Sequence, residues 1–462
     1  MPPLDANAPH AHCPPLACPH NPRMPLTAQA QQSLMWGIFA VTYIGIALGR
    51  FPKLVLDRTG IALLGAIAML AVHGLSISQA AAQIDWPTML LLFGLMIFSA
   101  QLRVAGFYVW TGGFLTRLTN RPRALLAGLI GTSALLSALL ANDIVCLAFT
   151  PLLCQALRSA RRDPIPYLLA LATSSNIGSA ATIIGNPQNM YIGTVAHLPF
   201  AHFSLIMTPI CLVCLALCWL MVVALFGKRL LALAPSPHLT LVSQSQNGDT
   251  LVPSSLPLQT QSPELDPYLI AKTLVLLGAL VVFFVINRGA HAAEYRAIAA
   301  LAGTGLLLCS HRAKAAKLYQ LVDWNLILLF LGLFVVNGAM KERGLTQQML
   351  DSVTRHGVKL DRPIPLSAVT LILSNLVSNV PAVLLLEPTL SAARSPKLWY
   401  LLALVSTWAG NLTLVGSIAN LIVAESAAAF GVEVNLKTYC KLGIPLTLVS
   451  VLAGTAWVVA LM

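Results

Sequence analysis

The chain has 462 residues, of which 57% are hydrophobic and only 10% are charged. Soluble domains carry about 25% charged residues, so this composition excludes an ordinary soluble enzyme and a disordered protein. The net charge of +12 comes from Lys and Arg residues that lie between apolar segments and form no continuous basic stripe. Basic residues in such positions are typical of membrane-flanking loops. We therefore expect an all-α polytopic membrane protein in a lipid bilayer, with no nucleic-acid partner.

Residues 1–32 differ in composition from the rest of the chain. They are rich in Pro, Ala and His and contain no continuous apolar core of a signal peptide, so we expect a disordered N-terminal tail. Either Met1 or Met24 could be the initiating residue. We predict no metal site in the tail, because its potential ligands lack the spacing of a standard zinc site. These potential ligands are His10, His12, Cys13, Cys18 and His20.

Twelve apolar segments follow the tail, and each approaches or exceeds the roughly 17–25 residues that a spanning helix needs. Six lie at approximately 33–49, 57–76, 86–104, 124–157, 165–196 and 204–226. Six more lie at approximately 268–287, 296–310, 324–340, 364–392, 397–425 and 440–461. A polar, proline-rich stretch separates the two sets. We therefore predict a first transmembrane repeat at 33–229, a polar linker at 230–267 and a second transmembrane repeat at 268–462.

The two halves also match in sequence. Asp85-Trp86 and Asp323-Trp324 are separated by 238 residues, Asn142 and Asn379 by 237, and the pairs Gly185/Gly416 and Asn189/Asn420 by 231. General similarity between apolar helices does not account for matched Asp-Trp, Asn and Gly positions in the same order. The sequence therefore indicates an internal duplication.

The fourth segment of each half carries polar residues near its middle, Asn142-Asp143 and Ser378-Asn379. Each of these segments is long enough for two short helical arms, so we predict a re-entrant hairpin in each half. Five spans then remain per half, and the second half is inverted relative to the first. In this topology most Lys and Arg residues fall on one side, which the positive-inside rule assigns to the cytoplasm. We predict both termini outside and residues 110–120 and 345–360 on opposite faces.

Clusters of Asn, Ser and Thr occupy the hairpins and the segments that follow them. Gly-Asn-Pro cannot continue a regular helix, so we predict broken helices at the midplane, at 185–187 and 410–416. Free helix N-termini attract anions and unwound carbonyls hold cations, whereas packing of small residues is the alternative explanation for single positions. The predicted substrate-binding residues are Asn142, Ser175, Asn176, Thr182, Asn186, Asn189, Ser378, Asn379, Thr407, Asn411, Thr413 and Asn420.

The runs 141–151, 175–189 and 410–420 resemble the ion transporter superfamily, which includes arsenite permeases, citrate and dicarboxylate:sodium symporters, and sodium/proton antiporters. The resemblance covers roughly residues 33–462. It implies a scaffold and a transport domain with two hairpins, usually in a homodimer that works by an elevator motion. Asn142, Ser378 and Asn379 match the Ser-Asn-Thr hairpin tips of the dicarboxylate symporters. The Asn-Asp pair at the first tip is closer to the arsenite-permease and antiporter branches.

Asp143 is an ionisable residue at a predicted midplane tip, and such residues usually serve function. We expect it to bind a cation or to carry a proton, together with Asn142, Asn379 and the backbone at Gly185 and Gly416. Capping of the next hairpin arm is the alternative. No Lys or Arg lies within 124–157, 165–196, 364–392 or 397–425. A small anionic substrate would therefore be held by helix N-termini and by amide and hydroxyl groups.

The chain contains no phosphate-binding loop for ATP and no hydrolase motif. We therefore expect no enzyme and no cofactor other than a coupling Na⁺ or H⁺. The main prediction is a secondary active transporter of a small anion or oxyanion, such as arsenite or a carboxylate, in the plasma (inner) membrane. A sodium/proton antiporter and a passive ion channel are the alternatives.

Overall fold

The computed structural model describes residues 27–49, 56–74, 76–232, 265–289, 291–393 and 395–462. Within these ranges the regular secondary structure is helical and contains no strand. The candidate metal ligands of the tail, both candidate start residues and most of the predicted linker lie outside the described residues. The first helix begins at Ala28, inside the range predicted as a tail, because the Thr27 side chain caps it by accepting from the Ala30 N–H.

The helices of the first half are α1 (Ala28–Leu48), α2 (Arg58–His73), α3 (Ile77–Ala82), α4 (Trp86–Val104), α5 (Phe107–Thr116), α6 (Pro122–Leu139), α7 (Asn142–Ser159), α8 (Ile165–Ser179), α9 (Pro187–Val195) and α10 (Phe200–Leu231). Those of the second half are α11 (Pro267–Ile286), α12 (Ala292–Leu308), α13 (Ala315–Tyr319), α14 (Trp324–Glu342), α15 (Leu345–Arg355), α16 (Pro363–Val377), α17 (Asn379–Ala393), α18 (Pro396–Ala409), the 3₁₀ turn η1 (Leu414–Gly416), α19 (Ile418–Ala428) and α20 (Leu436–Leu461).

Seven of the described helices are long and apolar enough to cross a membrane: α1, α4, α6, α10, α11, α14 and α20. The helices α2, α16 and α19 are also apolar but shorter. These properties confirm the predicted all-helical, polytopic membrane class. The short helices α3, α5, α13 and α15 were not predicted, because they connect the apolar segments and carry no long apolar run themselves.

The same order of elements occurs in both halves, and matched residues begin matched helices. Asp85 caps α4 by accepting from the Thr88 N–H at 2.9 Å, and Asp323 caps α14 by accepting from the Leu326 N–H at 3.0 Å. The tryptophan after each aspartate donates its indole N–H to a backbone carbonyl five residues earlier, at 3.1 and 3.0 Å. The repeated Asp-Trp pairs therefore mark equivalent helix starts.

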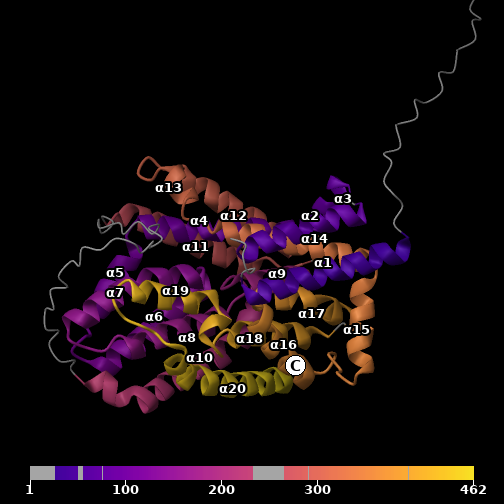
Figure 1. Cartoon of the computed structure of the whole chain (residues 1–462). Coiled ribbons are helices and arrows are strands. Elements are labelled where there is room, and N and C mark those ends of the chain that lie inside the picture. The colour runs from indigo at the N-terminus through magenta and orange to yellow at the C-terminus, as the bar shows by residue number, and fades with distance from the viewer. Residues whose placement is uncertain (1–26, 50–55, 75, 233–264, 290, 394) are drawn as a thin grey trace, which may run out of the picture.

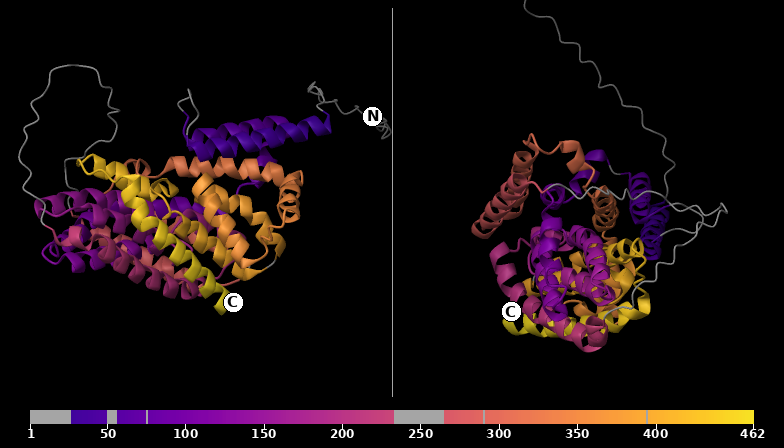
Figure 2. Two further views of the ribbon diagram at one scale, coloured as in Figure 1. Left: turned by 60° about the horizontal axis from the view of Figure 1, so that its bottom comes forward. Right: turned by 90° about the vertical axis from the view of Figure 1, so that its left-hand side faces the viewer.

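The helices form two groups. We call α1, α2, α4, α11, α12 and α14 the scaffold, in which α2 packs on α14 and α12 packs on α4. We call α6–α10 and α16–α20 the hairpin bundle. The right-hand view of Figure 2 shows the indigo and salmon-to-orange scaffold helices along one side of this bundle. Each half contributes helices to both groups.

The bundle contains two helical hairpins, one made by α6 and α7 and the other by α16 and α17. Figure 1 shows α5 beside α7 at one end of the molecule, and α15 beside the second hairpin toward the other end. We call these the α5 end and the α15 end. The hairpins thus extend from opposite ends of the molecule, and their tips at Asn142 and Ser378 line a common cavity.

Two helices of the bundle are interrupted. The first stops at Ser179 in α8 and resumes at Pro187 in α9, and the second stops at Ala409 in α18 and resumes at Ile418 in α19. The structure therefore has both predicted helix breaks, which extend over residues 180–186 and 410–417. Proline at the start of α9 is compatible with this position, because the first N–H groups of a helix have no partner within it.

Candidate functional site

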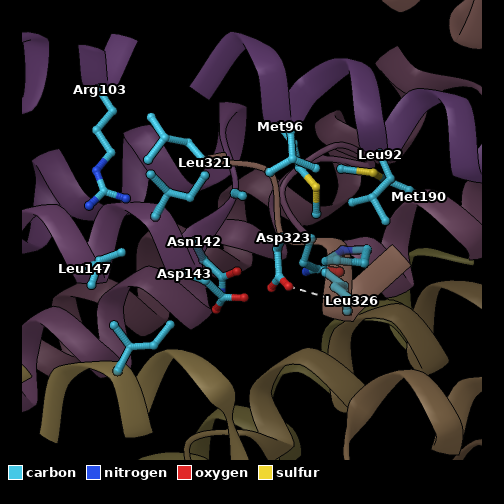
Figure 3. Close-up of a pocket in the computed structure, with 16 residues that line it drawn as sticks. Leu92, Met96, Arg103, Asn142, Asp143, Leu147, Met190, Leu321, Asp323 and Leu326 are labelled. Atoms are coloured by element: carbon cyan, nitrogen blue, oxygen red, sulfur yellow. Dashed lines mark hydrogen bonds between the residues drawn. The ribbon is translucent and has the colours of Figure 1, made fainter. Parts of the chain in front are cut away.

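A cavity of about 200 Å³ lies between the tip of the first hairpin and the scaffold. Asn142, Asp143 and Asn186 line it from the hairpin bundle. Arg103, near the end of α4, and Asp323, at the start of α14, line it from the scaffold. Most other lining residues are apolar, including Leu92, Met96, Leu147 and Met190 (Figure 3). The cavity therefore lies at the boundary between the two groups of helices.

Asp143 and Asp323 face each other across this cavity (Figure 3). Asp143 lies in the first turn of α7, and the Asp323 carboxylate also caps α14. In the part of the chain that the structure describes, neither carboxylate forms an ion pair within 4.0 Å. Asp143 is half-buried and Asp323 is exposed, so their like charges repel each other, although solvent screens part of the repulsion. A cation between the two carboxylates would remove this repulsion.

A smaller cavity of about 40 Å³ is lined by both hairpin tips. Asn142 and Asp143 come from the first tip, and Ser378 and Asn379 from the second. Asn379 Oδ1 is buried and, among the described residues, has no hydrogen-bond partner. Ser378 has φ 78° and ψ 163°, a backbone conformation that only glycine adopts readily. The two tips therefore meet around a polar space that contains an amide oxygen without a partner.

The Asn176 side chain is the centre of a buried polar network behind these cavities. Its Oδ1 accepts from the Asn142 amide at 3.0 Å and from the Ser417 hydroxyl at 3.2 Å. Its Nδ2 donates to Asn411 Oδ1 at 2.9 Å and to Asn420 Oδ1 at 3.2 Å. Asn176 is 2% exposed, so it connects the first hairpin tip directly to the second broken helix.

The network is reciprocal between the two broken helices. Asn189 donates to the carbonyl of Thr182, and Asn420 donates to that of Thr413, at 3.3 and 3.2 Å. Each asparagine thus satisfies a carbonyl that its own helix break leaves free. Across the bundle, Asn186 Nδ2 donates to Thr407 Oγ1 at 3.1 Å. The residues at the equivalent positions, Ser417 and Asn176, make the matching bond, in which Ser417 Oγ donates to Asn176 Oδ1 at 3.2 Å. Matched positions of the two broken helices therefore make matched hydrogen bonds.

Gly185 allows the first break to fold tightly against the end of α8. A Cβ atom at this position would lie 2.2 Å from the Ser179 carbonyl oxygen, which is an impossible contact. Asn186 follows it and caps α9, with its Oδ1 accepting from the Asn189 N–H at 2.8 Å. The Gly-Asn-Pro sequence is thus a compact break, cap and helix start.

The structure brings some predicted site residues into the cavities and leaves others behind them. Those that line the cavities are Asn142, Asp143, Asn186, Ser378 and Asn379. Those that do not line them are Ser175, Asn176, Thr182, Asn189, Thr407, Asn411, Thr413 and Asn420. The side chains of this second set hydrogen-bond to each other, to backbone carbonyls or, for Thr413, to Asn375 Oδ1. Their contact with substrate stays a prediction, as does coordination of a coupling ion near Gly185 and Gly416.

Sequence reasoning missed the scaffold side of the cavity. The sequence indicates Asp323 only as half of a repeated Asp-Trp pair, and Arg103 only as one of the Lys and Arg residues on the predicted cytoplasmic side. Gln188, which donates to Thr407 Oγ1 at 3.3 Å, and Asn375, which donates to the Ala409 carbonyl at 2.9 Å, were also not predicted. Their positions within polar or repeated motifs were the available signals. Among the described residues, no three His, Cys, Asp or Glu side chains are grouped to hold a metal ion.

Hairpin tips and broken helices that meet at a cavity, in an all-helical multi-pass membrane protein, define the class of integral membrane transporters. The chain belongs to the citrate transporter family, whose profile matches residues 43–407. It is therefore a secondary transporter and not an enzyme.

Individual relatives cover nearly the whole chain. The chain is 31% identical to the silicon efflux transporter LSI3 of Oryza sativa subsp. japonica, over 90% of this chain and 95% of the rice protein. It is 25% identical to the putative transporter arsB of Dictyostelium discoideum, over 91% of each chain. Among solved structures, the YdaH transporter of Alcanivorax borkumensis is similar over 93% of this chain and 97% of its own, with a TM-score of 0.49 and 12% identity.

Proposed function

We propose that the chain is a secondary active transporter of a small oxyanion or weak oxyacid, coupled to a cation or proton that binds at Asp143. The observation that carries this proposal is the cavity in which Asp143 of the hairpin bundle faces Asp323 of the scaffold. A carboxylate substrate, also expected from the sequence, is the second possibility within the same transporter class.

Coupling would arise because the two carboxylates belong to different helix groups. With no cation bound, their repulsion disfavours the arrangement in which the first hairpin tip lies beside the start of α14. A cation or proton at Asp143 removes this repulsion and shifts the conformational equilibrium toward it. Asn142 and Asn379, which line the adjoining cavity, would supply amide oxygens for the same cation.

The cavity lining suits a small hydroxyl-bearing substrate. The polar groups that line the smaller cavity with Asp143 are amides and hydroxyls, from Asn142, Asn186, Gln188, Ser378, Asn379 and Ser417. These groups can both donate to and accept from an oxyacid, whereas a strongly anionic substrate has only Arg103 as a basic partner in the larger cavity. The name of the rice relative, a silicon efflux transporter, agrees with an oxyacid substrate, whereas the name of the citrate transporter family agrees with a carboxylate.

We further propose that the two halves are inverted repeats and that the hairpin bundle moves relative to the scaffold as an elevator. In support, α14 of the scaffold packs against α17, which is an arm of the second hairpin. The equivalent helices of the first half, α4 and α7, are separated by the 200 Å³ cavity at the start of α7. The scaffold and the hairpin bundle are thus in closer contact toward the α15 end. Such an asymmetry is expected if the bundle alternates between two positions along the scaffold and the structure has one of them. A homodimer in the plasma (inner) membrane completes the proposal.

Flux into proteoliposomes tests this function. Purified protein would be assayed with arsenite, silicic acid, citrate, succinate and sulfate under an imposed Na⁺ or H⁺ gradient. We expect an oxyacid to accumulate above its external concentration only when a gradient is present. Transport that reaches equilibrium but never concentrates any of these substrates, with or without a gradient, would contradict active transport and favour a channel.

The facing carboxylates also support a second candidate, a sodium/proton antiporter in which Asp143 exchanges the two cations. A pH-sensitive dye inside the same proteoliposomes separates the two functions. An internal pH change driven by Na⁺ in the absence of every anionic or oxyacid substrate would support the antiporter. A pH change that requires the oxyacid would support coupled substrate transport.

A further inference from the structure

Arg296 is a buried cation that joins the scaffold to the hairpin bundle. It lies near the start of α12 and is 2% exposed. Its Nη1 donates to the Leu198 carbonyl at 3.1 Å, its Nη2 to the Gly193 carbonyl at 3.2 Å, and its Nε to the Ala292 carbonyl of its own helix at 3.2 Å. A permanently charged guanidinium is stable in this position because three carbonyl oxygens compensate it.

Two of these carbonyls belong to the C-terminal cap of α9. The Leu198 N–H donates to the Gly193 carbonyl at 3.1 Å, and the His197 N–H donates to the Thr194 carbonyl at 3.2 Å. His197 adopts a left-handed φ of 50°, so the cap is a Schellman motif. Arg296 therefore binds the negative end of the broken helix, where a cation is most favourable.

The second broken helix ends in the same motif. At the end of α19, the Val432 N–H donates to the Ala427 carbonyl at 3.1 Å, and the Gly431 N–H donates to the Ala428 carbonyl at 2.8 Å. Gly431 has a left-handed φ of 69°. In this structure the cap receives a hydrogen bond from Arg158 of α7 to the Phe430 carbonyl, which is a contact within the hairpin bundle.

The scaffold carries a second arginine in the position equivalent to Arg296. Arg58 begins α2, which packs on α14 as α12 packs on α4. It lies 238 residues before Arg296, at the same separation as the repeated Asp-Trp pairs. Arg58 is half-buried, and no described residue accepts a hydrogen bond from it. One arginine of the pair is thus engaged with a broken-helix cap, while the other has no such contact.

We propose that Arg296 and Arg58 are alternating latches of the transport cycle. Arg296 holds the cap of α9 against α12 in the conformation described here. Arg58 holds the cap of α19 against α2 after the hairpin bundle has moved to the other end of the scaffold. Each latch stabilises one conformation because its contacts exist only in that conformation. This inference rests on the proposed movement of the bundle, but not on the identity of the substrate or of the coupling ion.

Two cysteine reporters distinguish the conformations. Leu147 of α7 lines the larger cavity, and Leu384 of α17, its equivalent in the second half, is buried here. In a background without reactive native cysteines, maleimide labelling of Leu147→Cys reports the present conformation. Labelling of Leu384→Cys reports the population of the opposite conformation. Both rates would be measured in proteoliposomes without substrate or ion gradient.

The two arginine variants have opposite expected effects. Arg296→Gln removes the latch of the present conformation, so labelling of Leu384→Cys accelerates about tenfold. Arg58→Gln removes the latch of the opposite conformation, so the same labelling slows about tenfold. A purely structural role would not give opposite signs. Equal changes, or no change in either variant, would overturn the proposal.

Two further comparisons keep the outcome decisive. If Arg296→Gln does not fold, Arg58→Gln alone still has to slow the labelling, and an unchanged rate refutes the latch. Arg296→Lys retains the charge and some donors, and is expected to shift the rate less than Arg296→Gln. If the reporters shift as expected while Asp143→Asn keeps gradient-driven uptake, the proposed coupling fails and the latch stands. If uptake depends on Asp143 but the reporters do not shift, the latch alone fails.

Discussion

The two hairpin tips occupy equivalent places in the two halves but differ in chemistry. Both present an asparagine to the cavities, Asn142 in the first tip and Asn379 in the second. The next residue is Asp143 in the first tip and Val380 in the second. The duplicated backbone thus supplies two similar helix ends at one polar space, and only one of them brings a charge. Because only the first tip carries a carboxylate, we propose that the first half couples the ion.

The two asparagines also differ in their surroundings. The Asn142 amide is tied to Asn176 of the first broken helix at 3.0 Å. Asn379 Oδ1 is buried without a partner among the described residues. A buried amide oxygen without a partner costs about 1–3 kcal/mol. We therefore interpret Asn142 as a residue that lines the cavities and is also part of the frame, and Asn379 as a residue that serves a ligand alone.

The largest expected effect comes from removing the charge that distinguishes the tips. Asp143→Asn should reduce gradient-driven uptake about 100-fold, because the amide cannot carry the proton or hold the cation. The variant should still fold, since asparagine is compatible with the first turn of α7. Uptake and thermal denaturation of the purified protein would be measured together.

The control is Asp351→Asn on the short helix α15, where the side chain is exposed and distant from both cavities. It should leave uptake unchanged. If Asp143→Asn retained the wild-type dependence on Na⁺ or pH, the difference between the tips would have no role in coupling.

The next effect distinguishes the two helix breaks. A Cβ at Gly185 would lie 2.2 Å from the Ser179 carbonyl oxygen. At Gly416 the closest atom, at 2.7 Å, is the side-chain oxygen of Asn375, and the nearest backbone oxygen, that of Gly410, is 3.1 Å away. A side chain can move but a packed backbone cannot. Gly185→Ala should therefore destabilise the protein by about 3 kcal/mol and Gly416→Ala by about 1 kcal/mol, in thermal or denaturant unfolding in detergent.

Gly131→Ala is the matched control, because a Cβ at this position of α6 meets nothing within 4 Å. It should be neutral or slightly stabilising, as alanine favours helix. Equal losses for Gly185→Ala and Gly416→Ala would mean that the two breaks are equally tolerant and that the close approach at Ser179 is not rigid.

Most of the fold could be predicted because its signals are local. Apolar length marks the spans, the Asp-Trp pairs mark repeated helix starts, and the sequence Gly185-Asn186-Pro187 marks a break. The cavity could be predicted only in part. Residues at the hairpin tips are recognisable as polar groups within apolar segments, and these do line it.

The opposite wall of the cavity could not be predicted, because it depends on which scaffold helix lies against the hairpin tip. Asp323 has an ordinary local role as a helix cap, and nothing in its neighbourhood indicates that it faces Asp143. The same limit applies to Asn176. Its residue type suggested a ligand, but the crossing of the broken helices makes it a bridge between them.

The smallest expected effect separates Asn142, which is also part of the frame, from Asn379. Asn379→Ala should weaken substrate binding about tenfold without lowering Tm, because Asn379 Oδ1 makes no hydrogen bond that folding would lose. Asn142→Ala should weaken binding and also lower Tm, because it removes a hydrogen bond to buried Asn176.

Cys214→Ala, a truncation on α10 outside both cavities, should affect Tm alone. Binding would be followed by the thermal shift that each substrate of the flux assay produces. If Asn379→Ala and Cys214→Ala altered binding equally, the second tip would be a packing element, and the polar space between the tips would not be where substrate binds.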